Sequence, residues 1–369
     1  MHVLLVTREF PPHVVGGVAY HAYNLAKGLT ASGHRVTVLS STAGDQADTG
    51  FDGLPGVDVR RLDCHRRGSP RFWFDRAVQS HLTPVPAWLD DIDLIHSHEY
   101  VRFNRTPVTQ PVVQKIHFNL ERKFDYFSVE QYPAPVRPIV RSALERGIRP
   151  LESKLERRAL SGADGIVFIS ELTREIQRQT TGVEQPSTVI HNGVDTERFS
   201  PTAGTDDSYF LFVGGRQTRK GHETVREAFA ETDRSLRIAG ATPPPDADPA
   251  SNIEYLGFVE QSELPALYAN ACALVHPAAY EPFGNVVLES LACGTPVIVS
   301  GPAHCGAAEI LTDEVARIVP PSDSAILTDT VVDFDKTNYT PEACRQLAER
   351  YSWTTVAEQT AAFAASISE

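Results

Sequence analysis

The residues best suited to chemistry lie in the second half of the chain, in Phe212-Val213-Gly214-Gly215-Arg216-Gln217-Thr218-Arg219-Lys220-Gly221. This segment places a glycine pair, two arginines and a lysine directly after a predicted strand, where open α/β sheets bind ligands. Cations there suit a diphosphate, because they stabilise the charge that develops on a leaving phosphate. We therefore expect Arg216 and Lys220 to bind a phosphate rather than to belong to a merely solvated face.

Two glutamates bracket the start of a predicted helix in Glu281-Pro282-Phe283-Gly284-Asn285-Val286-Val287-Leu288-Glu289. The helix that begins near Asn285 offers free N–H groups to an anion. Glu289 lies about one turn into this helix, where its carboxylate can accept hydrogen bonds from ribose hydroxyls. Glu281 precedes the loop, nearer the reacting group. Both glutamates are therefore candidate binding residues.

A second glycine pair, Gly16 and Gly17, follows the first predicted strand and precedes a helix. Backbone N–H groups at such a position can approach an anion, and the helix dipole adds to the attraction. The dinucleotide fingerprint Gly-x-Gly-x-x-Gly is absent, so an NAD-binding first domain is not expected. An ordinary strand-to-helix turn is the alternative.

The elements that position these residues alternate between strand and helix, which predicts an α/β protein with parallel sheets covered on both faces. In the first half the predicted strands are His2–Thr7, Arg35–Ser40, Val57–Leu62, Asp93–His96, Val112–His117, Gly165–Ile169 and Thr188–His191. The pattern restarts after Asp195–Pro201 with strands Tyr209–Val213, Leu236–Ala239, Ile253–Leu256, Ala273–His276, Pro296–Val299 and Ala316–Val319. The helices predicted between them are His222–Ala230, Ser262–Ala269, Asn285–Cys293 and Ala307–Leu311.

This pattern predicts two Rossmann-like domains facing each other across a cleft, residues 1–195 and 196–350. A final segment, residues 351–369, contains a helix over about Trp353–Ile367 that could pack against either domain. The segment Thr242–Ala250, with three consecutive prolines, is expected to be a loop.

Composition limits the class of protein. The chain has 369 residues, of which 41% are apolar and 22% charged, and a net charge of −13, as in ordinary globular proteins. The charge balance is +2 over residues 1–190 and −15 over the rest, which suggests an anionic partner for the first half or simply an acidic proteome. Five scattered cysteines argue against a disulfide framework or a zinc site. Without an apolar run of membrane-spanning length or a basic leader, we expect a cytoplasmic protein.

The segment from Glu281 to Glu289 resembles the Glu-x7-Glu motif of retaining glycosyltransferases of family 4, which have the GT-B fold. Further segments are similar to the same family in the same order, so the resemblance covers nearly the whole chain. They are Gly16-Gly17, Ala163–Ser170, His191–Asp195, Leu256–Val259 and Ser290–Ile298, and Tyr351-Ser352-Trp353 resembles the start of the helix that returns to the N-terminal domain.

The resemblance implies a role for each matching residue. Arg216 and Lys220 would hold the donor diphosphate, although the spacing between them is one residue shorter than in many relatives, so Arg219 could take the role of the lysine. Glu289 would bind the ribose and Glu281 the donor sugar, and His117 would lie beside the anomeric carbon. Backbone groups would complete the donor site at Gly16, Gly17, Phe258, Val259, Phe283, Gly284 and Asn285.

The resemblance also implies a metal-independent enzyme without a cofactor, whose donor is a UDP- or GDP-linked sugar. His96-Ser97-His98-Glu99 is not accompanied by a further ligand set in the sequence, so a metal site is not expected, and His98 is assigned to the acceptor side. Nucleic acid is not an expected partner. The basic amphipathic stretch Arg137–Arg158 could contact an anionic membrane at the inner face, or it could be a solvated helix paired with Glu145, Glu152 and Glu156.

The resemblance implies transfer of a hexosyl group from a nucleoside-diphosphate sugar to an acceptor hydroxyl of a glycan, glycolipid or small molecule, with retention at the anomeric carbon. The donor would bind the C-terminal domain and the acceptor the N-terminal domain. A nucleoside-diphosphate-sugar epimerase and an inactive nucleotide-sugar-binding scaffold are the alternatives. Base recognition through backbone and variable acceptor loops leave the donor and the acceptor unspecified.

Overall fold

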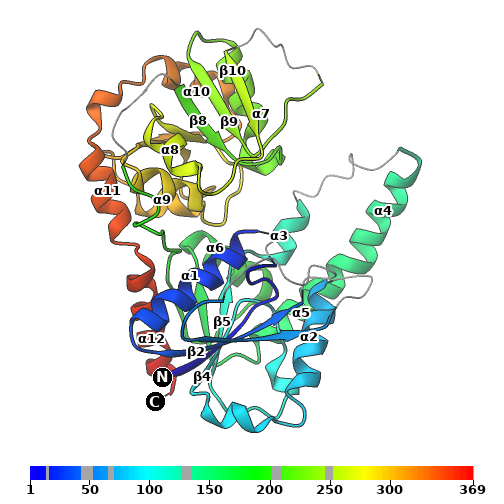
Figure 1. The fold of residues 1–369 in the computed structure, drawn as a ribbon. Coiled ribbons are helices and arrows are strands. Elements are labelled where there is room, and N and C mark those ends of the chain that lie inside the picture. The colour runs from blue at the N-terminus through cyan, green and yellow to red at the C-terminus, as the bar shows by residue number, and fades with distance from the viewer. Residues whose placement is uncertain are drawn as a thin grey trace. The chain divides into compact units, whose positions relative to one another are not determined.

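A computed structural model describes residues 1–13, 16–42, 53–64, 70–125, 134–201, 209–245 and 252–368. Internal contacts divide the chain into two compact units (Figure 1). The first unit combines Met1–His191 with Trp353–Glu369, and the second is Asn192–Ser352. In the described part of the chain, helices long and apolar enough to span a membrane are not found.

The first unit contains a parallel sheet of seven strands in the order β3-β2-β1-β4-β5-β6-β7. The order reverses direction between β1 and β4, so the carboxyl ends of these two strands form the switch point where α/β sheets bind ligands. The strands are β1 His2–Val6, β2 Arg35–Ser41, β3 Val57–Leu62, β4 Leu94–Ser97, β5 Val112–Ile116, β6 Gly165–Phe168 and β7 Ser187–Val189.

Helices cover both faces of this sheet. On one face α1, Gly17–Ala31, buries Ala22, Leu25, Ala26 and Leu29 at helical spacing against the strands. On the opposite face α2, Pro70–His81, contributes to a separate core cluster. The other helices of this unit are α3 Leu120–Asp125, α4 Arg137–Ala143, α5 Arg149–Leu160, α6 Glu171–Thr181 and α12 Trp353–Ser368.

The last helix, α12, packs against α1 within the first unit (Figure 1). Alanine at Gly28 of α1 is expected to destabilise this unit by about 1–3 kcal/mol, because the contact has no room for a larger residue. A Cβ atom at Gly28 would lie 2.5 Å from the main-chain oxygen of Trp353 and 3.1 Å from the Cβ of Ala357.

Urea unfolding of Gly28→Ala measures this cost. Gly147→Ala is the matched control, because Gly147 is exposed and a Cβ there would meet nothing within 4 Å. The control is expected to be neutral or to stabilise by up to about 1 kcal/mol. Equal losses in the two variants would contradict the proposed close approach of α1 and α12.

The second unit contains a parallel sheet of six strands in the order β10-β9-β8-β11-β12-β13. Its switch point lies between β8 and β11. The strands are β8 Tyr209–Val213, β9 Ser235–Ala239, β10 Ile253–Gly257, β11 Leu274–His276, β12 Val297–Ser300 and β13 Ala316–Val319. The helices are α7 His222–Ala230, α8 Leu264–Ala269, α9 Asn285–Ala292, α10 Ser324–Val332 and α11 Pro341–Glu349.

The predicted α/β class with two parallel Rossmann-like sheets is confirmed. One helix prediction is wrong in type: residues 307–311 contain a short 3-10 helix, Gly306–Ile310. The main chain of this short helix is hydrogen-bonded to the loop that precedes α9, because Ala307 N donates to Phe283 O at 2.7 Å. Of the predicted proline-rich loop Thr242–Ala250, residues 246–250 lie outside the described residues, and the remainder is neither helix nor strand.

Candidate active site

The carboxyl edge of the second sheet gathers most of the predicted donor residues. The basic segment follows β8, Phe258 and Val259 follow β10, and Glu281 follows β11. Because β8 and β11 are neighbours at the switch point, residues that are about 60 positions apart in sequence meet there. This edge is therefore the candidate ligand site of the second unit.

The basic segment forms a tight loop between β8 and α7. A 3-10 turn, Thr218–Lys220, leads into Gly221, which has a φ of 77°. A Cβ at Gly214 would lie 3.1 Å from Cδ of Lys220, so the lysine stem runs along the glycine pair. Arg216 is exposed at the tip of the loop. At the end of β8 the loop therefore presents the ammonium of Lys220 and the guanidinium of Arg216, which makes no hydrogen bond or ion pair with the described residues.

Glu281 is held by cations from this loop. Its Oε2 lies 3.1 Å from Nη1 of Arg219 and 3.7 Å from Nε2 of His276. Burial by itself would raise the pKa of Glu281, but His276, Lys220 and Arg219 hold that pKa well below its usual range. Glu281 is therefore ionised at neutral pH, and Arg219 serves as its partner.

The main chain around Glu281 is fixed by a second segment. Its N–H donates to the carbonyl of His304 at 2.7 Å, and its carbonyl accepts from Gly306 at 3.0 Å. The intervening Cys305 is fully buried, and burial raises its pKa to about 12. Cys305 is therefore a packing residue.

The start of α9 follows directly. Gly284 has a φ of 101°, and a Cβ there would lie 3.3 Å from Cγ of Glu281, so this position favours glycine. Asn285 begins the helix, and its Oδ1 accepts from Nδ2 of Asn192 at 2.9 Å. Phe283 is 1% exposed, and its carbonyl accepts from Ala307 N at 2.7 Å. Asn192 was not predicted individually, although it lies in the His191–Asp195 motif.

Glu289 lies one turn into α9, four residues after Asn285. Its Oε2 accepts a hydrogen bond from the hydroxyl of Tyr268 at 2.8 Å. Burial raises the pKa of Glu289, while the Tyr268 hydroxyl opposes this shift. Tyr268 thus orients the carboxylate, and no pattern in the sequence linked these two residues.

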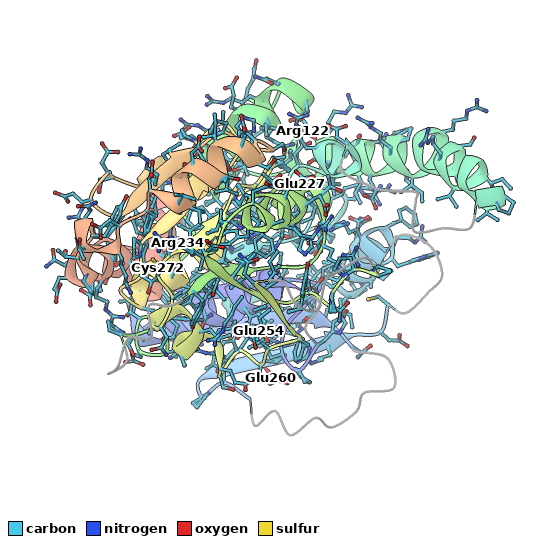
Figure 2. All side chains as sticks on the ribbon, turned by 90° about the horizontal axis from the view of Figure 1, so that it is seen from above. Arg122, Glu227, Arg234, Glu254, Glu260 and Cys272 are labelled. Carbon is cyan, nitrogen blue, oxygen red and sulfur yellow. The ribbon has the colours of Figure 1, made fainter. Side chains whose placement is uncertain are left out.

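Phe258 and Val259 begin the loop after β10, between Glu254 and Glu260 (both labelled in Figure 2). Phe258 is 83% exposed, the highest fraction among the exposed large hydrophobic residues of the described chain. The ring of Phe258 is therefore accessible at the carboxyl edge of the second sheet.

The first unit places four histidines together near the ends of β4 and β5. Nδ1 of His96 lies 3.1 Å from Nε2 of His98, and Nδ1 of His98 lies 3.0 Å from Nε2 of His117. The ring of His21, from α1, packs edge-on against His117 with centroids 4.7 Å apart. His98 and His117, which were predicted separately, are therefore in direct contact. His96 was singled out in the sequence only as part of His96-Ser97-His98-Glu99, and His21 was not singled out at all.

The sequence indicated no further ligands beside His96 and His98, and this inference is wrong. Ligand atoms of His21, His98 and His117 all lie within 4.8 Å of one another, so the described residues do contain a trio with metal-ligating geometry. Two observations oppose a cation there: His98 and His117 are already hydrogen-bonded, and the buried Lys115 ammonium acts on all three rings.

Lowering the pH from 7.5 to 5.5 is expected to destabilise the first unit. Burial lowers the pKa of His21 and His98 well below 6.5 and that of His96 to about 3. Below pH 6.5 the unfolded chain therefore binds protons that the folded chain does not. The free energy of unfolding consequently decreases as the pH is lowered. Each group contributes up to about 1.4 kcal/mol per pH unit in this window.

Urea unfolding at several pH values measures the slope, and the difference between wild type and His21→Phe isolates one group. The variant is expected to have a shallower slope below pH 6.5. An identical slope would show that His21 is not held neutral by the fold.

Gly16 and Gly17 lie at the start of α1, in the connection that follows the carboxyl end of β1. Both are exposed, and Gly16 is extended, with a φ of −165°. A Cβ at Gly16 would meet nothing within 4 Å, so steric room at this position is left for a ligand. The preceding Val14 and Val15 lie outside the described residues.

A buried carboxylate also lies at this edge. Glu99, two residues after β4, has Oε1 3.4 Å from Nε of Arg8 and Oε2 3.5 Å from Nε of Arg71. The two arginines neutralise it, so Glu99 is a paired structural group.

Two Rossmann-like parallel sheets, with cations and two glutamates at the carboxyl edge of the second, define a glycosyltransferase of the GT-B fold. A family model described as Glycosyltransferase Family 4 matches residues 15–198, and a model described as Glycosyl transferases group 1 matches residues 193–350. The chain belongs to the family 4 type of glycosyltransferases.

The chain is similar over its whole length to known proteins. An uncharacterized glycosyltransferase of Methanocaldococcus jannaschii is 28% identical over 98% of this chain and 97% of that protein. Sucrose-phosphate synthase from Thermosynechococcus elongatus has a TM-score of 0.77 at 20% identity, covering 99% of this chain and 98% of the other. Anabaena HepE in complex with UDP and glucose has a TM-score of 0.68 at 19% identity, covering 99% of each chain. The two solved structures share the fold.

Proposed function

We propose that this glycosyltransferase moves a hexosyl group from a nucleoside-diphosphate sugar to an acceptor hydroxyl, with retention at the anomeric carbon. The observation that carries the proposal is the edge of the second sheet, where Arg219 pairs with an ionised Glu281 that precedes the amino end of α9, and where Lys220 and the exposed Arg216 lie in the same loop as Arg219. Cations and helix N–H groups suit a diphosphate, and a carboxylate suits sugar hydroxyls. HepE, which shares the fold, was crystallised with UDP and glucose.

In the proposed reaction the anomeric carbon loses its bond to the donor phosphate oxygen and gains a bond to the acceptor oxygen on the same face. The acceptor proton passes to the departing phosphate, so a covalent glycosyl-enzyme is not required. Arg216 and Lys220 stabilise the negative charge that develops on the leaving diphosphate. Glu281 orients the transferred sugar, and Glu289 binds the ribose. The reaction is proposed to need neither metal nor cofactor.

Incubation of the full chain with a panel of UDP- and GDP-sugars tests this proposal. Thermal shift first identifies the donor, since a ligand at about 100 times its Kd stabilises by about 2.7 kcal/mol. Transfer is then followed with candidate acceptors, and the anomeric configuration of the first product is read by NMR. Conversion of the donor sugar without an acceptor would favour an epimerase, binding without turnover a scaffold, and an inverted product would overturn retention.

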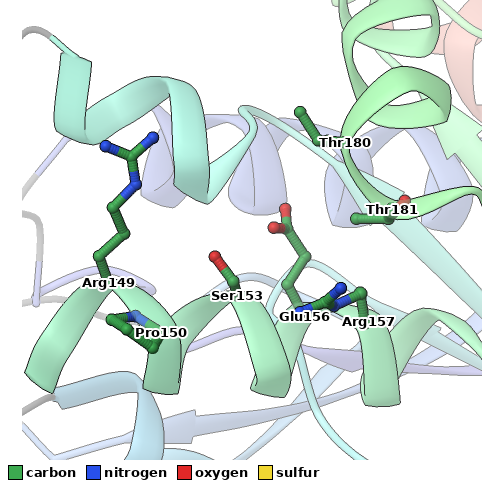
Figure 3. A pocket seen from close by; sticks show the side chains of 7 residues that line it. All are labelled: Arg149, Pro150, Ser153, Glu156, Arg157, Thr180 and Thr181. Atoms are coloured by element: carbon green, nitrogen blue, oxygen red, sulfur yellow. The ribbon is translucent and has the colours of Figure 1, made fainter. Parts of the chain in front are cut away.

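We further propose that the region from Val136 to Arg158 contacts an anionic membrane surface. Four of its apolar side chains are exposed: Val136 37%, Ile139 68%, Ile148 40% and Leu151 46%. Basic residues accompany them, and Figure 3 shows two of these, Arg149 and Arg157, on α5 beside a pocket of about 370 Å³. Exposed apolar and basic side chains together are typical of interfacial helices.

The alternative of a solvated helix depended on glutamates of this region pairing at the surface. Glu152 and Glu156 are instead buried, and Oε1 of Glu156 accepts from the N–H of Leu120 at 3.2 Å. The carboxylates of Glu152 and Glu156 therefore do not lie on the exposed face, and the side chain of Glu145 lies outside the described residues.

Co-sedimentation with phosphatidylglycerol vesicles at low salt is expected to pellet the wild-type chain, because the apolar side chains insert and the arginines attract the lipid. The double variant Ile139→Glu/Leu151→Glu is expected to stay in the supernatant. Val332→Glu, which changes an equally exposed residue of α10, is the control and is expected to pellet like wild type. Absence of wild-type binding at low salt would remove the membrane proposal.

A further inference from the structure

Three imidazole rings form a continuous hydrogen-bonded chain that ends at His117. The chain runs from His96 in β4 to His98, which follows that strand, and then to His117 after β5, with N···N distances of 3.1 and 3.0 Å. The nitrogens at the two contacts are Nδ1 of His96 with Nε2 of His98, and Nδ1 of His98 with Nε2 of His117. Each contact requires one N–H and one unprotonated nitrogen.

The first ring fixes the direction of the chain. Nε2 of His96 is buried and has no hydrogen-bond partner in the described chain. Buried N–H groups without an acceptor are rare in folded proteins because they are costly, so Nε2 is the unprotonated nitrogen. The proton of a neutral His96 therefore lies on Nδ1, which donates it to Nε2 of His98.

The remaining protons follow from the neutrality of the rings. Nε2 of His98 accepts from His96, so a neutral His98 carries its proton on Nδ1 and donates it to Nε2 of His117. A neutral His117 then carries its proton on Nδ1, because the hydrogen bond at one imidazole nitrogen decides the state of the other. We infer that His96 and His98 are positioning residues that fix the tautomer of His117 and leave its Nδ1–H free to donate to the substrate.

The surroundings keep all three rings neutral. The groups that act on them are Lys115 of β5 and the His21 ring of α1, which packs against His98 and His117. Lys115 is buried with its Nζ 3.2 Å from the carbonyl of Ile190, and burial lowers its pKa to about 7. Burial and this lysine lower the pKa of His98 and His117 well below 6.5. An imidazolium at either position could not accept from the preceding ring.

The substrate-facing part of this inference rests on the proposed function. A neutral N–H donor at Nδ1 of His117 would bind a sugar hydroxyl or a phosphate oxygen of the donor. The tautomer itself does not depend on the reaction and can be measured on the chain alone.

Nitrogen-15 NMR of the full chain with labelled histidine, recorded at pH 7.5 without substrate, tests the tautomer. The His117 signals are assigned by their loss in His117→Gln. Wild type is expected to show a protonated Nδ1 and an unprotonated Nε2. His98→Phe is expected to lose this preference, and His21→Phe, which keeps the packing and lies outside the chain of hydrogen bonds, is expected to retain it. A protonated Nε2 of His117 in wild type would overturn the inference.

Kinetics provide the second readout, once a donor is known. His98→Phe is expected to lower kcat by about 10-fold to 100-fold, the size of effect that loss of an orienting partner has at other sites. His98→Asn keeps a donor near the position of Nδ1 and is expected to recover most of kcat. Equal kcat values for Phe and Asn would contradict a positioning role. If no donor supports transfer, the proposed function fails, while the NMR result still decides the tautomer.

Discussion

Glu281→Gln is expected to lower kcat by about 10³-fold, the upper range for loss of one charged group at a reacting centre. Glutamine keeps the size of the side chain but removes the charge that Arg219, Lys220 and His276 hold in place. A sugar hydroxyl that donates to an ionised carboxylate binds more strongly than one that donates to an amide. The loss therefore appears in turnover with the identified donor.

The fold is expected to survive this substitution. The side chains of Arg219 and Glu281 are 30% and 13% exposed, so the pair is partly buried and removing the charge is expected to cost about 1–3 kcal/mol. For a unit of this size each kcal/mol shifts Tm by about 2–4 °C. Glu227→Gln is the matched control, because Glu227 is an exposed glutamate of α7 in the same unit (labelled in Figure 2). A kcat for Glu281→Gln within threefold of the Glu227→Gln value would refute the assignment of Glu281.

Arg216→Ala is expected to lower kcat/KM by about 10³-fold without a measurable change in Tm. Arg216 is exposed and makes no hydrogen bond or ion pair with other described residues, so the folded chain loses no contact. Its guanidinium would instead bind the donor diphosphate, and arginines that stabilise a leaving phosphate can contribute this much. Binding of the free nucleoside diphosphate is expected to weaken in the same variant.

Two variants sharpen this prediction. Arg216→Lys keeps the charge but not the planar fork of donors, so it is expected to recover activity only in part. Arg317→Ala removes an exposed arginine of β13 from the same unit and is expected to leave both kcat/KM and nucleotide binding unchanged. If Arg216→Ala binds the nucleoside diphosphate as tightly as Arg317→Ala, the cationic loop is not the phosphate site.

The placement of the donor residues at strand ends was predictable because it depends on local signals. Strands β8 and β13 and helix α7 have the predicted bounds, since apolar runs, helical spacing and glycines mark them within short windows. In the second unit two helices, α10 and α11, were not predicted. Only Leu327 and Val331 of α10 are buried, so its apolar stripe is weak. Helix α11 does carry a stripe, Cys344, Leu347 and Ala348, after the N-cap Thr340, and this local signal was overlooked.

The partners of the site residues could not be predicted from the sequence. The pair Arg219–Glu281 joins residues 62 positions apart, and it exists because β8 and β11 are neighbours in a sheet whose strand order differs from the chain order. Strand order also brings His21 of α1 against His98 and His117, because β1, β4 and β5 are neighbours in the first sheet. The sequence therefore did not reveal that these three rings have metal-ligating geometry.

The sequence by itself determined the class of fold, the family and the residues that carry charge at the ends of strands. Tertiary structure alone decided that Arg219 holds Glu281, that Tyr268 orients Glu289, that Glu152 and Glu156 are buried, and that three histidines share two hydrogen bonds. Secondary structure follows from interactions within a few residues, which a sequence displays directly. Contacts between elements follow from how sheets and helices pack, and the protonation state of a buried group follows from those contacts.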